Sequence, residues 1–217
     1  KSIPITIHKS TQYKFTIFKK NLMDNKEKIL EIIKTRKIVQ LIHFTKKKNI
    51  NSIIKHGLLS VDELKKRNID YIFNDPERRD SWNTAISLSI TNKNSILLDG
   101  FKRRQKLNDS DFVEIKIDPL VIVENICIFC DTNAANHTFE TYRQDNDKLN
   151  HLKIWPSFEG MFKNIVYRHY NGETGKIKRF KQELNETTCL QAEICLIGNI
   201  SSDKFINYNE LNLLTNG

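Results

Sequence analysis

Apolar side chains recur every three or four residues in two stretches of the chain, Asn25–Thr35 and Lys48–His56, and this spacing predicts two amphipathic helices. Gly57 directly follows the second stretch, at a position where glycine commonly ends a helix. Ser60–Glu63 reads Ser-Val-Asp-Glu, a capping-box sequence that predicts the start of another short helix. Ser157–Asn164 predicts one more short helix, with its first serine as the N-cap.

Other stretches have the length and composition of strands. Ala85–Ile90 alternates, so that its Ile and Leu residues are predicted to face inward and its two Ser residues outward. Ile38–Thr45, Phe112–Ile117 and Asn125–Cys130 are further predicted strands. Asn164–Glu186 has few apolar residues and is predicted as a long loop. Because helices and strands do not alternate regularly, the pattern predicts an α+β fold rather than a series of βαβ units.

The last apolar stretch, Leu190–Ile197, predicts a strand with one chemically informative face. A period of two places Leu190 and the apolar residues at 192, 194 and 196 on one side, and Gln191 and Glu193 on the other. The carboxylate can hold a ribose hydroxyl and stabilise positive charge on the sugar, while the amide orients an incoming nucleophile. A Gln-x-Glu sequence also arises by chance, so this interpretation requires a partner site elsewhere in the chain.

Length and charge narrow the class of protein. At 217 residues, the chain is predicted to form one domain with a sizeable core. Its net charge of +9 indicates either a polyanionic partner such as nucleic acid or a drift in composition toward Lys, Asn and Ile. The densest cationic run, Lys102–Arg104, is predicted either to bind phosphates or to form an exposed helix face. No apolar run reaches the roughly 20 residues that span a bilayer, so we expect a cytoplasmic protein that does not enter a membrane.

The cysteines do not favour a metal site. Cys127 and Cys130 have a Cys-x-x-Cys spacing, but they lie on a predicted strand, where residues three apart face opposite sides. Cys189 and Cys195 lack the spacing of a second pair of zinc ligands. We therefore expect buried thiols in a reducing compartment and no metal.

Two polar runs are candidates for cofactor binding. His43–Thr45 lies where a predicted strand gives way to a helix, where backbone amides favour anions and His and Thr side chains can bond a ribose or a carboxamide. Taken alone, this run favours a structural histidine beside a core phenylalanine. Arg78 and Arg79 lie in the polar stretch Asp70–Asn83, where an arginine can hold a diphosphate with two hydrogen bonds or remain solvated.

Together these runs resemble the DarT family of DNA ADP-ribosyltransferases over residues 38 to 207. Each run is short, but their shared order is more specific than any one of them. The runs that carry the resemblance are His43–Thr45, Asn49-Ile50, Ser52-Ile53, Gly57–Ser60, Glu77–Asp80, Ala85–Ser89, Thr132–Ala135, Phe158–Phe162 and Gln191–Glu193.

The resemblance implies an ADP-ribosyltransferase fold over residues 38–217, with a split central β-sheet and a cleft that holds NAD. Residues 1–37 would form an N-terminal helical extension. The resemblance further implies a toxin that transfers ADP-ribose from NAD to a base in single-stranded DNA, and an antitoxin partner of the DarG type that carries a macrodomain.

The resemblance also assigns roles by position. Glu193 is expected to be the catalytic glutamate and Arg78 the catalytic arginine, a role for which Arg79 is the alternative, while Gln191 would meet the acceptor base. The expected NAD contacts are His43, Phe44, Thr45, Asn49, Ser52, Gly57, Leu59, Ser60 and Arg79. The expected nucleic-acid contacts are Lys102, Arg103, Arg104 and Arg179.

One segment departs from the family. Thr91–Asn94 replaces the sequence usual after the Ala85–Ile90 strand, which leaves base and strand preference open. The alternatives are the same reaction on RNA or on protein, and a non-catalytic module that binds nucleic acid. The presence of His43, Gln191 and Glu193 argues against the last. No self-complementary apolar stripe is evident, so we expect a monomer.

Overall fold

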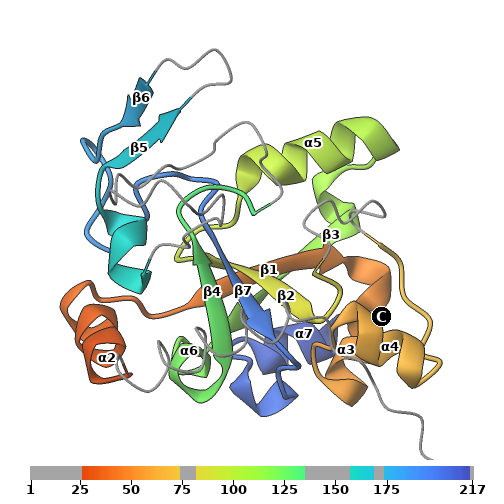
Figure 1. The fold of residues 1–217 in the computed structure, drawn as a ribbon. Helices are drawn as coiled ribbons and strands as arrows, with labels where there is room; N and C mark the ends of the chain where they lie inside the picture. The colour runs from red at the N-terminus through yellow and green to blue at the C-terminus, as the bar shows by residue number, and fades with distance from the viewer. Residues whose placement is uncertain (1–25, 74–81, 135–156, 169–173, 216–217) are drawn as a thin grey trace, which may run out of the picture.

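The structure is a computed structural model that describes residues 26–73, 82–134, 157–168 and 174–215. Within these ranges the chain forms a five-stranded antiparallel sheet, a separate two-stranded sheet and surrounding helices (Figure 1). Arg78 and Arg79 lie outside the described residues, as do Ala135 and the beginning of the predicted N-terminal extension. The division of the chain at residue 37 stays a prediction.

The elements are as follows. The large sheet has the order β3-β1-β2-β7-β4, and its strands are β1 (Leu41–Lys46), β2 (Ala85–Ile90), β3 (Phe112–Ile117), β4 (Ile126–Cys130) and β7 (Glu193–Ile197). The small sheet consists of β5 (Ile165–Arg168) and β6 (Thr174–Ile177). The α-helices are α2 (Lys26–Thr35), α3 (Ile50–His56), α4 (Val61–Lys66), α5 (Ser95–Gln105), α6 (Val121–Glu124) and α7 (Tyr208–Leu213). The 3₁₀ helices are η1 (Lys47–Asn49), η2 (Asp109–Asp111), η3 (Phe158–Phe162) and η4 (Ser202–Lys204).

The large sheet is nearly divided between β1 and β2. Strand β1 pairs with β3 from Leu41 to Lys46, but with β2 only at Leu41 and Ile42. Beyond Ile42 the two strands separate, and β2 pairs with β7 instead. The predicted α+β fold with a split central sheet is therefore confirmed, and the split creates the space in which the candidate site lies.

The alternation along β7 places apolar side chains on both faces of the sheet. Ile194 and Leu196 belong to the main core, whereas Cys195 belongs to a smaller apolar cluster on the other face of the sheet. In Figure 1, α2, α6, α7 and α3 lie in the lower part of the view, and α5 with β5 and β6 lies in the upper part. The predicted strand over Leu190–Ile197 begins only at Glu193, and Leu190, expected on the same side as Ile194 and Leu196, is instead 55% exposed.

The first predicted helices are confirmed, and Gly57 has a clear reason to be glycine. It ends α3 with a φ of 79°, in the left-handed region that side chains disfavour. A Cβ atom at this position would lie 2.6 Å from the carbonyl oxygen of Ile200. Leu58 bridges to the same Ile200, so the glycine allows the end of α3 to dock against the segment that follows β7.

Two local predictions are wrong. Ser60 is the N-cap of α4, but no capping box forms, because Asn199 Oδ1 accepts the Ser60 N–H at 2.9 Å and the Glu63 carboxylate bonds Arg67. The long loop predicted over 164–186 contains the β5–β6 hairpin.

The prediction that Cys127 and Cys130 face opposite sides of their strand is confirmed. Cys127 belongs to the main core and Cys130 to the opposite cluster, as expected for positions three apart on a strand. Burial raises the pKa of the Cys127 thiol. In the described ranges, no group of three potential metal-ligating side chains is present, and no helix is long and apolar enough to cross a membrane.

Candidate active site

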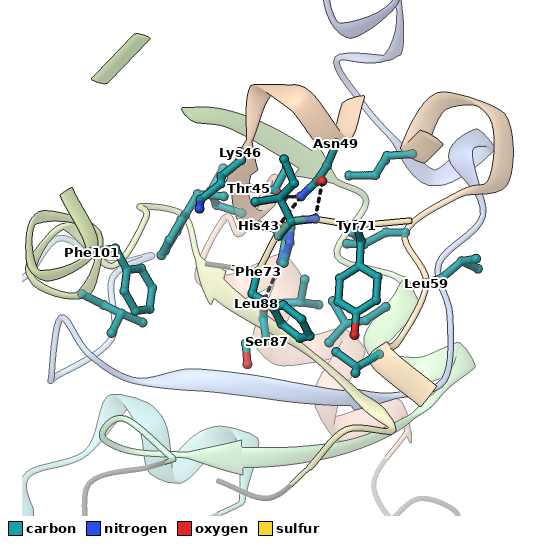
Figure 2. Close-up of a pocket in the computed structure, with 18 of the residues that line it drawn as sticks. His43, Thr45, Lys46, Asn49, Leu59, Tyr71, Phe73, Ser87, Leu88 and Phe101 are labelled. Carbon is teal, nitrogen blue, oxygen red and sulfur yellow. Dashed lines mark hydrogen bonds between the residues drawn. The ribbon is translucent and has the colours of Figure 1, made fainter. Parts of the chain in front are cut away.

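A cavity of about 960 Å³ opens where β1 and β2 separate (Figure 2). This is toward the upper end of the volumes of small-molecule sites in proteins. The predicted cofactor contacts that line it are His43, Phe44, Thr45, Asn49, Ser52, Gly57 and Leu59. Ser60 does not line it and is buried at the start of α4. Gln191 and Glu193, from the far end of the sequence, line the same cavity.

His43 bridges the two separating strands. Its Nδ1 lies 3.0 Å from the carbonyl oxygen of Ser87 on β2. Because a carbonyl only accepts hydrogen bonds, Nδ1 carries the proton, and Nε2 of the neutral ring is then an acceptor. Ser87 and Ser89, predicted to face outward, line this cavity, and Ser89 is buried.

Asn49 uses its amide to brace one wall of the cavity. Its Nδ2 donates to Thr45 Oγ1 at 3.1 Å and to the carbonyl oxygen of Ile72 at 2.9 Å. Its Oδ1 accepts the Ile72 N–H at 2.9 Å. Asn49 therefore holds the backbone of Ile72 as a neighbouring strand would, and the structure gives it a bracing role beside the cofactor contact predicted from sequence.

The braced segment carries an aromatic pair that the sequence analysis missed. The rings of Tyr71 and Phe73 lie 4.4 Å apart, nearly edge to face, and both line the cavity (Figure 2). Burial, and to a lesser extent the charge of Asp62, raises the pKa of the Tyr71 phenol, which therefore stays protonated at neutral pH. The available signal was two aromatic residues that flank Ile72 in an otherwise polar stretch.

Glu193 forms the opposite wall and is held by backbone. It is only 6% exposed at the start of β7, and its Oε1 accepts the N–H of Ala134 at 2.5 Å. Ala134 belongs to the turn that follows β4, so the small residues of that turn let its backbone approach the carboxylate. Cys130 pairs with Glu193 in the sheet, and its thiol pKa is raised by a hydrogen bond with Cys195, by burial and by nearby negative charge. A neutral thiol therefore lies beside the carboxylate.

The predicted nucleic-acid contacts are not equivalent. Lys102 forms ion pairs at 2.7 Å with both Asp99 and Asp109, whereas Arg104 lines the cavity and stacks over Phe101. Arg103, between them, is exposed. Of this cluster, only Arg104 lies at the cavity.

Arg179 lies apart from the α5 cluster and has structural partners. Its guanidinium donates to the carbonyl oxygens of Glu186 at 2.6 Å and Glu183 at 2.5 Å. Its predicted contact with nucleic acid stays a prediction.

The segment Thr91–Asn94, expected from the sequence to depart from the family, has a structural use. Thr91 Oγ1 donates to the carbonyl oxygen of Asn185 at 2.8 Å, and Asn92 Nδ2 donates to Glu186 Oε1 at 2.7 Å. The segment thereby holds the turn that leads toward Gln191. Ala192 N–H, which donates to the carbonyl oxygen of Cys189 at 3.0 Å, closes the last turn before the strand.

Comparison with known proteins agrees with this arrangement. A family model described as "DarT: ssDNA thymidine ADP-ribosyltransferase" matches residues 42–201 of the chain. No curated protein matches the chain. The matched residues contain both walls of the cavity, from His43 to Glu193, and begin after α2.

Proposed function

The chain belongs to the DarT family of ssDNA thymidine ADP-ribosyltransferases, and on this premise we propose that the cavity at the split of the sheet binds NAD and that Glu193 is the catalytic carboxylate. As a member of this family, the chain is an NAD-dependent transferase that acts on thymidine in single-stranded DNA. The observation that carries the site assignment is that Gln191 and Glu193 share one cavity with His43 and Tyr71, although the sequence separates them widely.

The groups around the cavity suit a dinucleotide. Phe44, Tyr71, Phe73 and Phe101 offer flat aromatic surfaces for heterocyclic rings. The imidazole of His43 and several hydroxyl and amide groups offer hydrogen bonds to ribose hydroxyls and a carboxamide. NAD supplies a ribose whose bond to nicotinamide can break with the electron pair leaving on nicotinamide.

Glu193 has the features that charge stabilisation requires. Its carboxylate is buried, so its interactions are stronger than they would be in water, and the Ala134 N–H fixes its orientation before any substrate binds. In this proposal Glu193 binds the ribose hydroxyl and stabilises the positive charge that develops on the sugar. The new bond joins the anomeric carbon of that ribose to a ring nitrogen of the thymine, whose proton passes to solvent.

Gln191 and Arg78 complete the proposal. Gln191 lines the cavity just before Glu193 and would orient the thymine, which must be unpaired to enter. Arg78 would stabilise negative charge on the diphosphate, because an arginine with its ordinary pKa is a poor general base. Arg79 is the alternative for that role.

The cellular role is proposed from family resemblance. The chain would act as a toxin in the cytoplasm, as a monomer, and a macrodomain antitoxin of the DarG type would remove its mark. No metal takes part in the proposed reaction.

In the decisive experiment, the full chain is incubated with labelled NAD and with one acceptor at a time. We expect label on single-stranded oligonucleotides that contain thymidine, and none on matched oligonucleotides without it. Duplex DNA, RNA and casein serve as the competing acceptors. Preferential labelling of RNA or protein, or label on single strands without thymidine, would contradict the proposal.

A further inference from the structure

A short turn at residues 183–186 leads toward Gln191 and is held by Arg179, which is near it in the chain, and by two side chains from distant parts, Arg36 and Thr91. The carbonyl oxygens of Glu183 and Glu186 accept from Arg179, and that of Asn185 accepts from Thr91. The remaining carbonyl, of Leu184, accepts from Arg36 Nη1 at 3.1 Å and, over a longer 3.4 Å, from Arg179 Nη2. An exposed turn can leave its carbonyls to water, so five side-chain bonds to these four carbonyls indicate that its position matters.

Arg36 reaches this turn from the end of α2. Its guanidinium carbon lies 4.2 Å from the centre of the Phe162 ring, and that of Arg179 lies 5.9 Å from the same ring. Burial and the like charge of Arg179 lower the pKa of Arg36. The two cations stay close together despite their repulsion, because the Leu184 carbonyl and the face of the Phe162 ring stabilise the positive charge of Arg36.

The chain between the turn and the catalytic strand is held as well. Thr188 N–H donates to the carbonyl oxygen of Met161 at 3.0 Å, and the Thr188 carbonyl accepts from Gln182 at 3.1 Å. Thr187 Oγ1 donates to the carbonyl oxygen of Cys189 at 2.7 Å. The segment that joins the turn to Gln191 is therefore short and fixed along its length, as is the turn itself.

We propose that Arg36 is a positioning residue for the DNA acceptor. By fixing Leu184 it places Gln191, and through Gln191 the thymine. The functional transferase unit then includes α2, although the family match begins at residue 42. This inference deepens the proposed function and rests on it.

The test compares Arg36→Ala and Arg36→Lys with the full chain. Lys28→Ala is the matched control, because it removes a cation from the same helix and breaks only the Lys28–Glu159 ion pair. Transfer to a thymidine oligonucleotide is measured with the KM for DNA and the KM for NAD determined separately, after thermal unfolding has shown that each variant is folded.

We expect Arg36→Ala to lower kcat/KM for DNA about tenfold, the usual scale for losing a hydrogen bond from a charged group. The KM for NAD should not change. Arg36→Lys should recover part of the loss, since lysine keeps one donor but not the planar group over Phe162. Lys28→Ala should behave as the unchanged chain does.

A second anchor allows an independent check. Thr91→Val removes the bond to Asn185, so its effect and that of Arg36→Ala should combine less than additively if both act on one turn. Amide hydrogen exchange of residues 183–190 should quicken in either variant and not in Lys28→Ala.

Three results would overturn the inference while the unchanged chain is active. These are normal transfer by Arg36→Ala, a rise in the KM for NAD equal to that for DNA, and the same loss in Lys28→Ala. If the unchanged chain itself transfers nothing to DNA, the proposed function fails, and the acceptor role of Arg36 fails with it.

Discussion

The two walls of the cavity are held in different ways. On the wall made by β1, α3 and residues 71–73, Asn49 bonds Thr45 and Ile72, which are 4 and 23 positions away in the chain. On the opposite wall, Glu193 bonds Ala134, which is 59 positions away. The first wall is a local unit of helix and loop, whereas the second exists only when β4 and β7 pair in the sheet. Binding of the cofactor and catalysis should therefore respond separately to mutation.

The largest effect is expected on the catalytic wall. Glu193→Gln should reduce transfer by about 100- to 1000-fold, because it removes a preorganised charge beside the ribose. The fold should persist, since the amide oxygen can still accept the Ala134 N–H. Initial rates of labelling give the loss, and an NAD titration of the same protein should show binding close to that of the unchanged chain. Turnover near the normal rate would remove Glu193 from the mechanism.

A smaller and different effect is expected on the other wall. Asn49→Ala should weaken NAD binding about tenfold, because Ile72 loses both backbone partners and Tyr71 and Phe73 lose their fixed position. At saturating NAD, the rate should recover most of its normal value. Steady-state kinetics with varied NAD measures this effect.

The control for this wall is Asn49→Asp, which keeps an acceptor for the Ile72 N–H but loses the donor to the Ile72 carbonyl. Its affinity for NAD should lie between those of Asn49→Ala and the unchanged chain. A kcat loss in Asn49→Ala as large as that in Glu193→Gln would show that the two walls are not separable.

The smallest effect is expected on α5, which borders the cavity through Arg104. Changing Arg103 and Arg104 to Ala should reduce the slope of log affinity against log salt by about 1.4 units on single strands if each neutralises one phosphate. Lys102→Ala should leave the slope unchanged, because Asp99 and Asp109 already compensate its charge. Equal slopes in all variants would place the DNA path away from α5.

The contrast between the walls also explains what the sequence could predict. Helix and strand periods identified α3, β2 and β3, because each depends on its own residues. Motif order brought His43 and Glu193 to one site, and their common cavity supports that placement.

The failures lie where distant partners compete with local signals. At the start of α4, the acceptor of the Ser60 N–H is Asn199, which lies near the far end of the chain, and not Glu63 as in a capping box. Tyr71 and Phe73 join the cavity only because Asn49 holds the backbone between them. None of these partners follows from periodicity.

The main-chain hold on Glu193 has a genetic consequence. Every amino acid except proline carries the N–H that Ala134 donates, so almost no substitution there can delete the bond itself. The burial of Ala134 then restricts that position by size alone. A cell under pressure to silence this transferase has few substitutions that leave a folded protein with a disoriented carboxylate. We therefore expect variants inactivated through this carboxylate to concentrate at Glu193 itself or at positions whose change unfolds the sheet, and rarely at Ala134.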